Sequence, residues 1–280
     1  MLRFIDAVSD RVLRTMGAES RVVMTSVGPV HAFDAKGRGE KTFVLLHGMG
    51  TTATSYMGLF RGLRSRAKRI LLLDLPGHGR STNGDERMSV ARLSAGVREA
   101  LDGLLDPADP VVLFGTSLGG AAALGYALER PERVRALILV SPGGAPFSAD
   151  DFDALKRRFN LVSRTDARRF FGELMHRPPL YTRLFERPLL AQLGHPVVKT
   201  FLESLAVEDC FTAEQVAKLR VPTLVIWGKS DRILPRSGLD FYRRELPSGT
   251  TFEEPEGLGH SPHLERPRWL LERIMSFSGV

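Results

Sequence analysis

The sequence predicts a doubly wound α/β domain with a mostly parallel sheet and an inserted helical cap. Short, continuous apolar runs alternate with helical patterns through the first half of the chain. Continuous apolarity is typical of parallel strands buried on both faces, and the alternation predicts right-handed β-α-β crossovers. A stretch rich in phenylalanine and proline, at about residues 145–210, interrupts the alternation and indicates several short helices. We therefore expect a core formed by residues 1–144 and 211–280, and a cap formed by residues 145–210.

The first two segments precede the buried strands. Residues 1–16 predict an amphipathic helix, because their apolar positions recur at helical spacing. Charged residues interrupt this segment, so it lacks the apolar stretch of a signal peptide. We expect a helix that lies on the domain; the alternative is an anchor at a membrane surface. Residues 21–33 have the pattern of a hairpin at a sheet edge, with Gly28-Pro29 between its arms.

Buried strands and their connecting helices follow in order. Apolar runs predict core strands at residues 42–47, 70–74, 111–115, 134–141 and 223–228, and a further strand at 250–253. Helical patterns fall at residues 54–66, 90–105 and 118–130, with a last helix from near Pro267. The carboxyl ends of parallel strands meet at one edge of a sheet, where such folds bind ligands. Residues directly after these strands are therefore the candidates for a functional site.

The composition argues against several classes of protein. The net charge is +7, but the basic residues are dispersed, with no zinc-finger spacing and no helix-turn-helix or RNA-binding signature, so we expect no nucleic-acid partner. The apolar runs are far shorter than the roughly 18 residues of a membrane helix, so we expect no integral membrane span. The single cysteine, Cys210, excludes an internal disulfide and is compatible with a cytoplasmic location.

The strongest chemical signal is the segment Gly115-Thr116-Ser117-Leu118-Gly119-Gly120. It directly follows an apolar strand and directly precedes a helical run, which is the context of a nucleophile elbow. Small residues on both sides allow a sharp turn that lifts the Ser117 hydroxyl out of the sheet. A phosphate-binding loop is a weaker reading, because no lysine follows the glycines.

A serine nucleophile needs a base, and the base needs a carboxylate that fixes its tautomer. Among seven histidines, His260 lies in a glycine-bounded loop after a strand, with His263 as the nearest rival. For His47 and His78 we expect contacts with the backbone of their turns, and for His31, His176 and His195 surface or packing roles. Asp231 directly follows the strand at 223–228 and is the candidate acid.

Developing negative charge on a substrate oxygen requires preorganised donors, and backbone N–H groups are the usual source. Leu118 follows the nucleophile at a helix N-terminus. The loop His47-Gly48-Met49-Gly50 follows the first long core strand. We expect the amides of Met49 and Leu118 to converge on one oxyanion. All of these groups belong to the protein, and no cluster has metal-ligand spacing, so we expect no metal and no cofactor.

Five segments together resemble the α/β-hydrolase fold enzymes of the esterase and lipase branch over nearly the whole chain. Besides the elbow, they are the loop at 47–50, Asp74-Leu75-Pro76-Gly77-His78-Gly79-Arg80-Ser81, Gly228-Lys229-Ser230-Asp231, and Gly259-His260-Ser261-Pro262-His263-Leu264-Glu265-Arg266-Pro267. The resemblance implies a Ser117–His260–Asp231 triad, a Met49/Leu118 oxyanion hole and a cap at residues 145–210.

The leading functional prediction is hydrolysis of carboxylic esters with small or medium apolar acyl chains, as in the carboxylesterases and lipases. C–C bond hydrolysis of meta-cleavage products and a low-turnover receptor role are the alternatives. A serine at the elbow argues against dehalogenases and epoxide hydrolases, which use aspartate. Where the C–C hydrolases commonly have tryptophan after the catalytic histidine, this chain has Ser261.

The predicted partner is a small-molecule ester, and the sequence does not indicate an oligomeric state. The apolar residues of the cap should supply the substrate pocket above the nucleophile. The predicted substrate contacts are His47, Gly48, Phe170, Phe171, Leu174 and Leu184.

Overall fold

The computed structural model describes residues 2–81 and 87–279, with side chains from Val8 onward. It confirms the predicted fold class: eight strands form one sheet in the order β1-β2-β4-β3-β5-β6-β7-β8. Neighbouring strands from β4 to β8 run parallel, whereas β1 and β2 are antiparallel additions at one edge. The strands are β1 Glu19–Thr25, β2 Gly28–Lys36, β3 Thr42–Leu46, β4 Arg69–Leu73, β5 Val111–Thr116, β6 Val134–Val140, β7 Thr223–Ile226 and β8 Thr251–Glu253.

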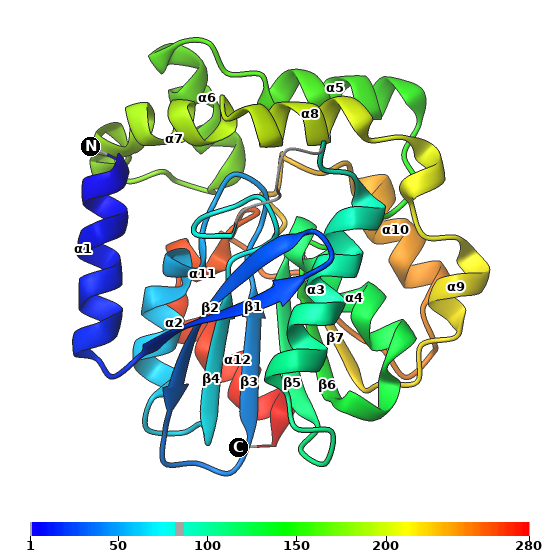
Figure 1. Cartoon of the computed structure of the whole chain (residues 1–280). Coiled ribbons are helices and arrows are strands. Elements are labelled where there is room, and N and C mark those ends of the chain that lie inside the picture. The colour runs from blue at the N-terminus through cyan, green and yellow to red at the C-terminus, as the bar shows by residue number, and fades with distance from the viewer. Residues whose placement is uncertain (1, 82–86, 280) are drawn as a thin grey trace.

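Helices cover both faces of the sheet and one of its ends (Figure 1). The helices of the α/β core are α1 Leu2–Thr15, η1 Ala53–Tyr56, α2 Met57–Leu63, α3 Val90–Leu104, α4 Leu118–Glu129, η2 Pro131–Arg133, α9 Ala213–Ala217, α10 Arg236–Glu245, α11 Pro262–Glu265 and α12 Pro267–Ser278. Between β6 and β7 lie α5 Ala149–Phe159, α6 Arg164–Leu174, η3 Leu180–Phe185, α7 Glu186–Leu193, α8 Pro196–Ser204 and η4 Val207–Asp209.

The alternation of side chains along each strand divides the core into two layers. Val44 and Leu46 of β3 pack with helices α3, α4 and α10 on one face. Phe43 and Leu45 of the same strand pack with α2 and α12 on the other face. Continuous apolarity in the central strands thus reflects burial on both faces, as the sequence predicted.

Two predicted elements differ in detail. The hairpin turn consists of Ser26-Val27, because Thr25 pairs with Gly28, so Gly28 and Pro29 already belong to β2. The helix predicted at 54–66 begins with a 3-10 turn and ends at Leu63, because Arg66 and Ala67 turn back to donate hydrogen bonds to the Leu63 carbonyl. Both differences concern boundaries and leave the order of elements unchanged.

The N-terminal helix α1 stands at one side of the domain (Figure 1). Leu13 is fully buried, and Asp10 forms an ion pair with Arg80 at 3.0 Å, so the helix is held against the domain at two points. Met1, which the predicted helix included, lies outside the described residues. Within the described ranges, no helix has both the length and the apolarity needed to cross a bilayer.

Candidate active site

The turn between β5 and α4 holds Ser117 in a strained backbone conformation, with φ 54° and ψ −120°. Such a turn leaves no room for neighbouring side chains. A Cβ on Gly115 would lie 2.2 Å from the Gly119 carbonyl oxygen, and one on Gly119 would lie 2.1 Å from the Leu46 carbonyl oxygen. The Ser117 N–H donates to the Val140 carbonyl at 3.0 Å, which ties the turn to β6. Close backbone packing therefore explains the glycines around the nucleophile.

Asp231 and His260 come from the loops after β7 and β8 and are joined by a hydrogen bond. Nδ1 of His260 lies 2.8 Å from Oδ2 of Asp231, and the Asp231 side chain is fully buried. Oδ1 of Asp231 accepts the N–H of Ile233 at 2.8 Å. Burial alone would raise the pKa of Asp231, but the charge and hydrogen bond of His260 and the Ile233 N–H lower it. Because the carboxylate is ionised and holds Nδ1–H, Nε2 of His260 is left to accept a proton.

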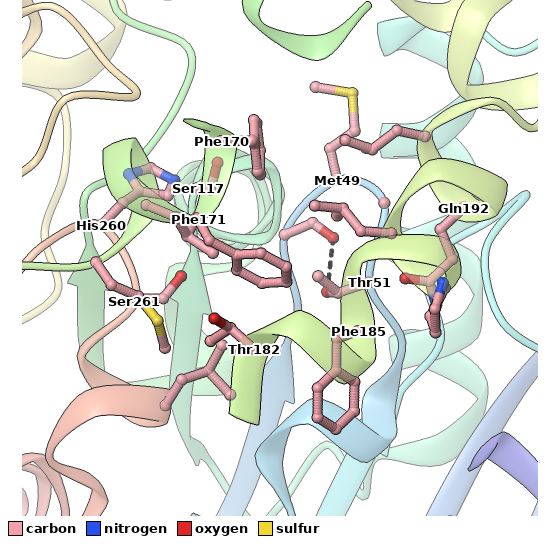
Figure 2. Close-up of a pocket in the computed structure, with 18 of the residues that line it drawn as sticks. Met49, Thr51, Ser117, Phe170, Phe171, Thr182, Phe185, Gln192, His260 and Ser261 are labelled. Atoms are coloured by element: carbon pink, nitrogen blue, oxygen red, sulfur yellow. Dashed lines mark hydrogen bonds between the residues drawn. The ribbon is translucent and has the colours of Figure 1, made fainter. Parts of the chain in front are cut away.

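Ser117 and His260 line the same cavity, and Figure 2 shows them on one side of it. No direct hydrogen bond between the two side chains occurs within the described part of the chain. Catalytic hydrogen bonds often shorten only when substrate binds, so this arrangement is compatible with a nucleophile and its base.

His263, the rival base, occupies a different environment. Its ring packs edge-on against Tyr56 at 4.9 Å, and Nδ1 is buried with no hydrogen-bond partner among the described residues. Burial lowers the pKa of His263 to about 3. Without a carboxylate to orient it, this imidazole lacks what His260 has. The geometry therefore favours His260 as the base.

The loop after β3 lies against the nucleophile. A Cβ on Gly48 would lie 3.3 Å from Cβ of Ser117, so the backbone of this loop approaches the serine directly. Thr51 Oγ1 donates to the Gly48 carbonyl at 3.0 Å and holds the loop in a turn (Figure 2). Met49, in this loop, lines the cavity together with Ser117, and Leu118 follows Ser117 as the first residue of α4. The role of their N–H groups as an oxyanion hole stays a prediction.

His47 holds this loop through hydrogen bonds to backbone groups and does not line the cavity. It is fully buried, its Nδ1 donates to the Gly48 carbonyl at 2.8 Å, and its Nε2 accepts the N–H of Leu75 at 3.1 Å. An acceptor Nε2 requires the neutral ring, and burial lowers the pKa of His47 accordingly. Its side chain therefore has a backbone role, not the substrate contact that we predicted for it.

The cavity beside Ser117 has a volume of about 230 Å³ and is mostly apolar. Four of the predicted substrate contacts line it: Gly48, Phe170, Phe171 and Leu174. Leu184 does not line it, and 69% of this residue is exposed. The prediction for Leu184 assumed a regular α-helix, but residues 180–185 form the 3-10 helix η3, which turns Tyr181, Thr182 and Phe185 toward the cavity instead.

Glu265 holds the loop that carries His260, and the sequence analysis did not single it out. Its carboxylate accepts the N–H of Gly259 and the N–H of His176, both at 2.7 Å. The N–H of His260 in turn donates to the Leu174 carbonyl at 2.8 Å. These bonds join the loop that carries the base to the end of α6. The sequence feature that could have pointed to Glu265 is its place in the segment from Gly259 to Pro267, which is one of the five segments that carry the family resemblance.

A second Ser–His–Asp set lies outside the cavity. Ser20 Oγ contacts Nε2 of His31 at 2.8 Å, and Nδ1 of His31 contacts Asp74 at 2.9 Å. Oδ1 of Asp74 accepts the N–H of Ala53 at 2.8 Å, so this set ties the edge strand β1 to the loop after β3. Burial alone would raise the pKa of Asp74, but the His31 bond, the nearby His47 and the Ala53 N–H lower it.

No group of three or more His, Cys, Asp or Glu side chains in the described ranges is arranged to hold a metal ion.

The chain is similar to several hydrolases. The profile of the alpha/beta hydrolase family matches residues 43–273. A 2-hydroxy-6-oxononadienedioate/2-hydroxy-6-oxononatrienedioate hydrolase from Cupriavidus pinatubonensis is 31% identical over 74% of this chain and 75% of its own. The monoacylglycerol lipase ABHD6 from Rattus norvegicus is 26% identical over 94% of this chain and 83% of its own. The solved structure of carboxylesterase CesB from Bacillus subtilis superposes with a TM-score of 0.80 at 19% identity, covering 99% of this chain and 98% of that one.

Proposed function

Because the chain belongs to the alpha/beta hydrolase family, we propose that it is a serine hydrolase that cleaves carboxylic esters with small or medium apolar acyl chains. The observation that carries the choice of substrate is the character of the cavity beside Ser117. Ten of its 22 lining residues are Phe, Leu or Met, and no Lys or Arg is among its described lining residues. A neutral, apolar ester fits such walls.

In the proposed reaction, Ser117 Oγ attacks the ester carbonyl while Nε2 of His260 takes the hydroxyl proton. The N–H groups of Met49 and Leu118 stabilise the oxyanion that forms, and Asp231 stabilises the imidazolium. His260 then donates its proton to the departing alcohol oxygen, which leaves an acyl group on Ser117. A water molecule, activated by His260, attacks this acyl-enzyme and releases the acid.

C–C bond hydrolysis is the second candidate, because several relatives about 30% identical carry that activity in their names. The named substrate of those relatives is a dioate and therefore carries two carboxylates. A buried carboxylate requires a cationic or strong hydrogen-bonding partner to offset the loss of its hydration. His263, which lines the cavity together with the catalytic base, is neutral because burial lowers its pKa to about 3. The lack of a cationic partner among the described lining residues therefore supports a neutral ester over a dioate as the substrate.

The position of the segment between β6 and β7 supports the proposal that this segment is a cap that selects the substrate. Its helices lie across one end of the sheet (Figure 1), and α6, η3 and α7 contribute most of the apolar walls above Ser117. We place the cap at residues 145–210 and the catalytic core at residues 1–144 and 211–280. A cap of this kind favours monomeric esters over an emulsified surface.

The test is a panel of p-nitrophenyl esters of increasing acyl length, run beside a triglyceride emulsion and a dienoate C–C substrate. We expect steady hydrolysis of the short and medium esters after any initial burst. Ser117→Ala should lower kcat/KM by about 10³-fold or more. Ser20→Ala is the matched control, since it removes a serine from the other Ser–His–Asp set, and it should retain activity. Faster turnover of the dienoate, or binding without turnover, would contradict the proposal.

A further inference from the structure

A second cavity, of about 180 Å³, opens beside the first. It lies between α3, α4 and α5, and its far wall contains Phe201 of α8 and the segment from Leu205 to Phe211. Met49, Ser117 and Phe159 line both cavities. The nucleophile therefore lies where two mostly apolar chambers meet. We call the chamber that contains His260 the first chamber and the other the second chamber.

The positions of the catalytic groups assign the two halves of an ester to the two chambers. His260 lines only the first chamber, and it must protonate the departing alcohol oxygen. Leu118, whose N–H is a proposed oxyanion donor, lines only the second chamber. The acyl and alcohol groups extend from opposite sides of the carbonyl carbon. An ester bound productively therefore places its alcohol in the first chamber and its acyl chain in the second.

Gly125 is exceptional among the glycines of α4. Gly119 and Gly120 are required by backbone packing, since a Cβ on either would lie within 3.0 Å of a neighbouring chain segment. A Cβ on Gly125 would meet only the Phe211 ring, at 3.8 Å, which is an ordinary contact. A glycine within a helix costs stability relative to alanine. Nothing in the packing of the helix requires that cost, and Gly125 lines the second chamber.

We propose that the second chamber binds the acyl chain and that Gly125 sets the longest chain it accepts. This inference rests on the proposed esterase function and specifies its substrate class. The described lining of the second chamber contains Glu129 and Asp209 but no Lys or Arg. The acyl chain it accepts is therefore uncharged at its far end, because a terminal carboxylate would face like charge.

The test compares Gly125→Leu with Gly172→Leu in two series of esters. The first series varies the acyl chain from acetate to decanoate with one alcohol, and the second varies the alcohol with one short acyl group. Gly172 is a matched control, since it lies within helix α6 and lines neither chamber, and a Cβ added to it would meet no atom within 4 Å. Circular dichroism and thermal unfolding verify that both variants are folded.

We expect Gly125→Leu to shorten the preferred acyl chain by about three carbons, because the leucine side chain fills space that the chain otherwise occupies. For the longest acyl chains kcat/KM should fall by about 10-fold or more. The acetate rate and the alcohol profile should stay within about twofold of the original protein, and Gly172→Leu should change neither series. A change confined to the alcohol series would overturn the assignment of chambers. Unchanged profiles in a folded Gly125→Leu protein would overturn the role of Gly125. An original protein that hydrolyses no ester would instead refute the proposed function.

Discussion

Replacement of His263 by phenylalanine should make the protein more resistant to acid. The imidazole is buried, has no hydrogen bond to Nδ1 among the described residues and packs edge-on against Tyr56. A phenyl ring preserves this aromatic contact and removes the titratable group. Burial, reinforced by the neighbouring His260 and His47, lowers the pKa of His263 from 6.5 to about 3.

The magnitude follows from proton linkage. Below pH 6.5 the unfolded chain binds a proton at this histidine, while the folded protein binds it only near pH 3. Above pH 6.5 the free energy of unfolding is therefore unaffected by protonation of His263. It falls as the pH decreases from 6.5 toward 3, because only the unfolded chain binds the proton. At about 1.4 kcal/mol per pH unit, the loss between pH 7 and pH 4.5 is about 2–3 kcal/mol.

Urea unfolding at pH 7 and pH 4.5 measures this loss. His263→Phe should reduce the decrease in unfolding free energy between the two pH values by about 2–3 kcal/mol relative to the original protein. His195→Asn is the control, because His195 is exposed and asparagine can replace its contact at the start of α8. If His263→Phe and the original protein lose equal stability on acidification, the imidazole is not held neutral by burial and the reasoning is wrong.

Three further substitutions test the site. Asp231→Asn should lower kcat by about 10²-fold or more, because the amide cannot stabilise the imidazolium of His260; exposed Asp240→Asn should have no effect in the same steady-state assay. Gly119→Ala forces a Cβ against the Leu46 carbonyl oxygen, so its unfolding free energy should fall by about 1–3 kcal/mol in urea titrations, whereas Gly172→Ala should be neutral or stabilising. Glu265→Gln leaves one of two partly buried N–H groups without an acceptor; thermal unfolding should show a lower Tm, and an unchanged Tm would remove Glu265 from its bridging role.

Features that depend on local sequence patterns were predictable, and those that depend on three-dimensional packing were not. The apolar runs predicted the central strands because burial on both faces favours continuous apolar residues, as at residues 43–46 of β3. The elbow around Ser117 and the loop residues Asp231 and His260 were found because small residues and strand ends mark them. In the structure, Nδ1 of His260 lies 2.8 Å from Oδ2 of Asp231, as the predicted pairing of base and acid requires.

The errors have physical causes in particular residues. Leu184 was assigned to the cavity on α-helical spacing, and a 3-10 turn rotates successive residues differently. For His47 the sequence supported both a backbone role and a substrate contact, and its two ring nitrogens are occupied by backbone groups. The second chamber could not be predicted, because it depends on how α3 and α5 pack beside α4.

The set formed by Ser20, His31 and Asp74 shows that a relay of these three side chains does not by itself make a reactive serine. Its spacings are those of a catalytic relay, yet Ser20 lies on the edge strand β1 and lines neither chamber. A search for Ser, His and Asp side chains joined by hydrogen bonds would therefore return this set, whereas in the Ser117 set only the bond between His260 and Asp231 is formed. An organophosphorus label should discriminate between them: peptide mapping of the labelled protein should find the phosphonyl group on Ser117 and none on Ser20. The reactivity of a serine then depends on the cavity and the backbone N–H donors around it more than on the three relay side chains themselves.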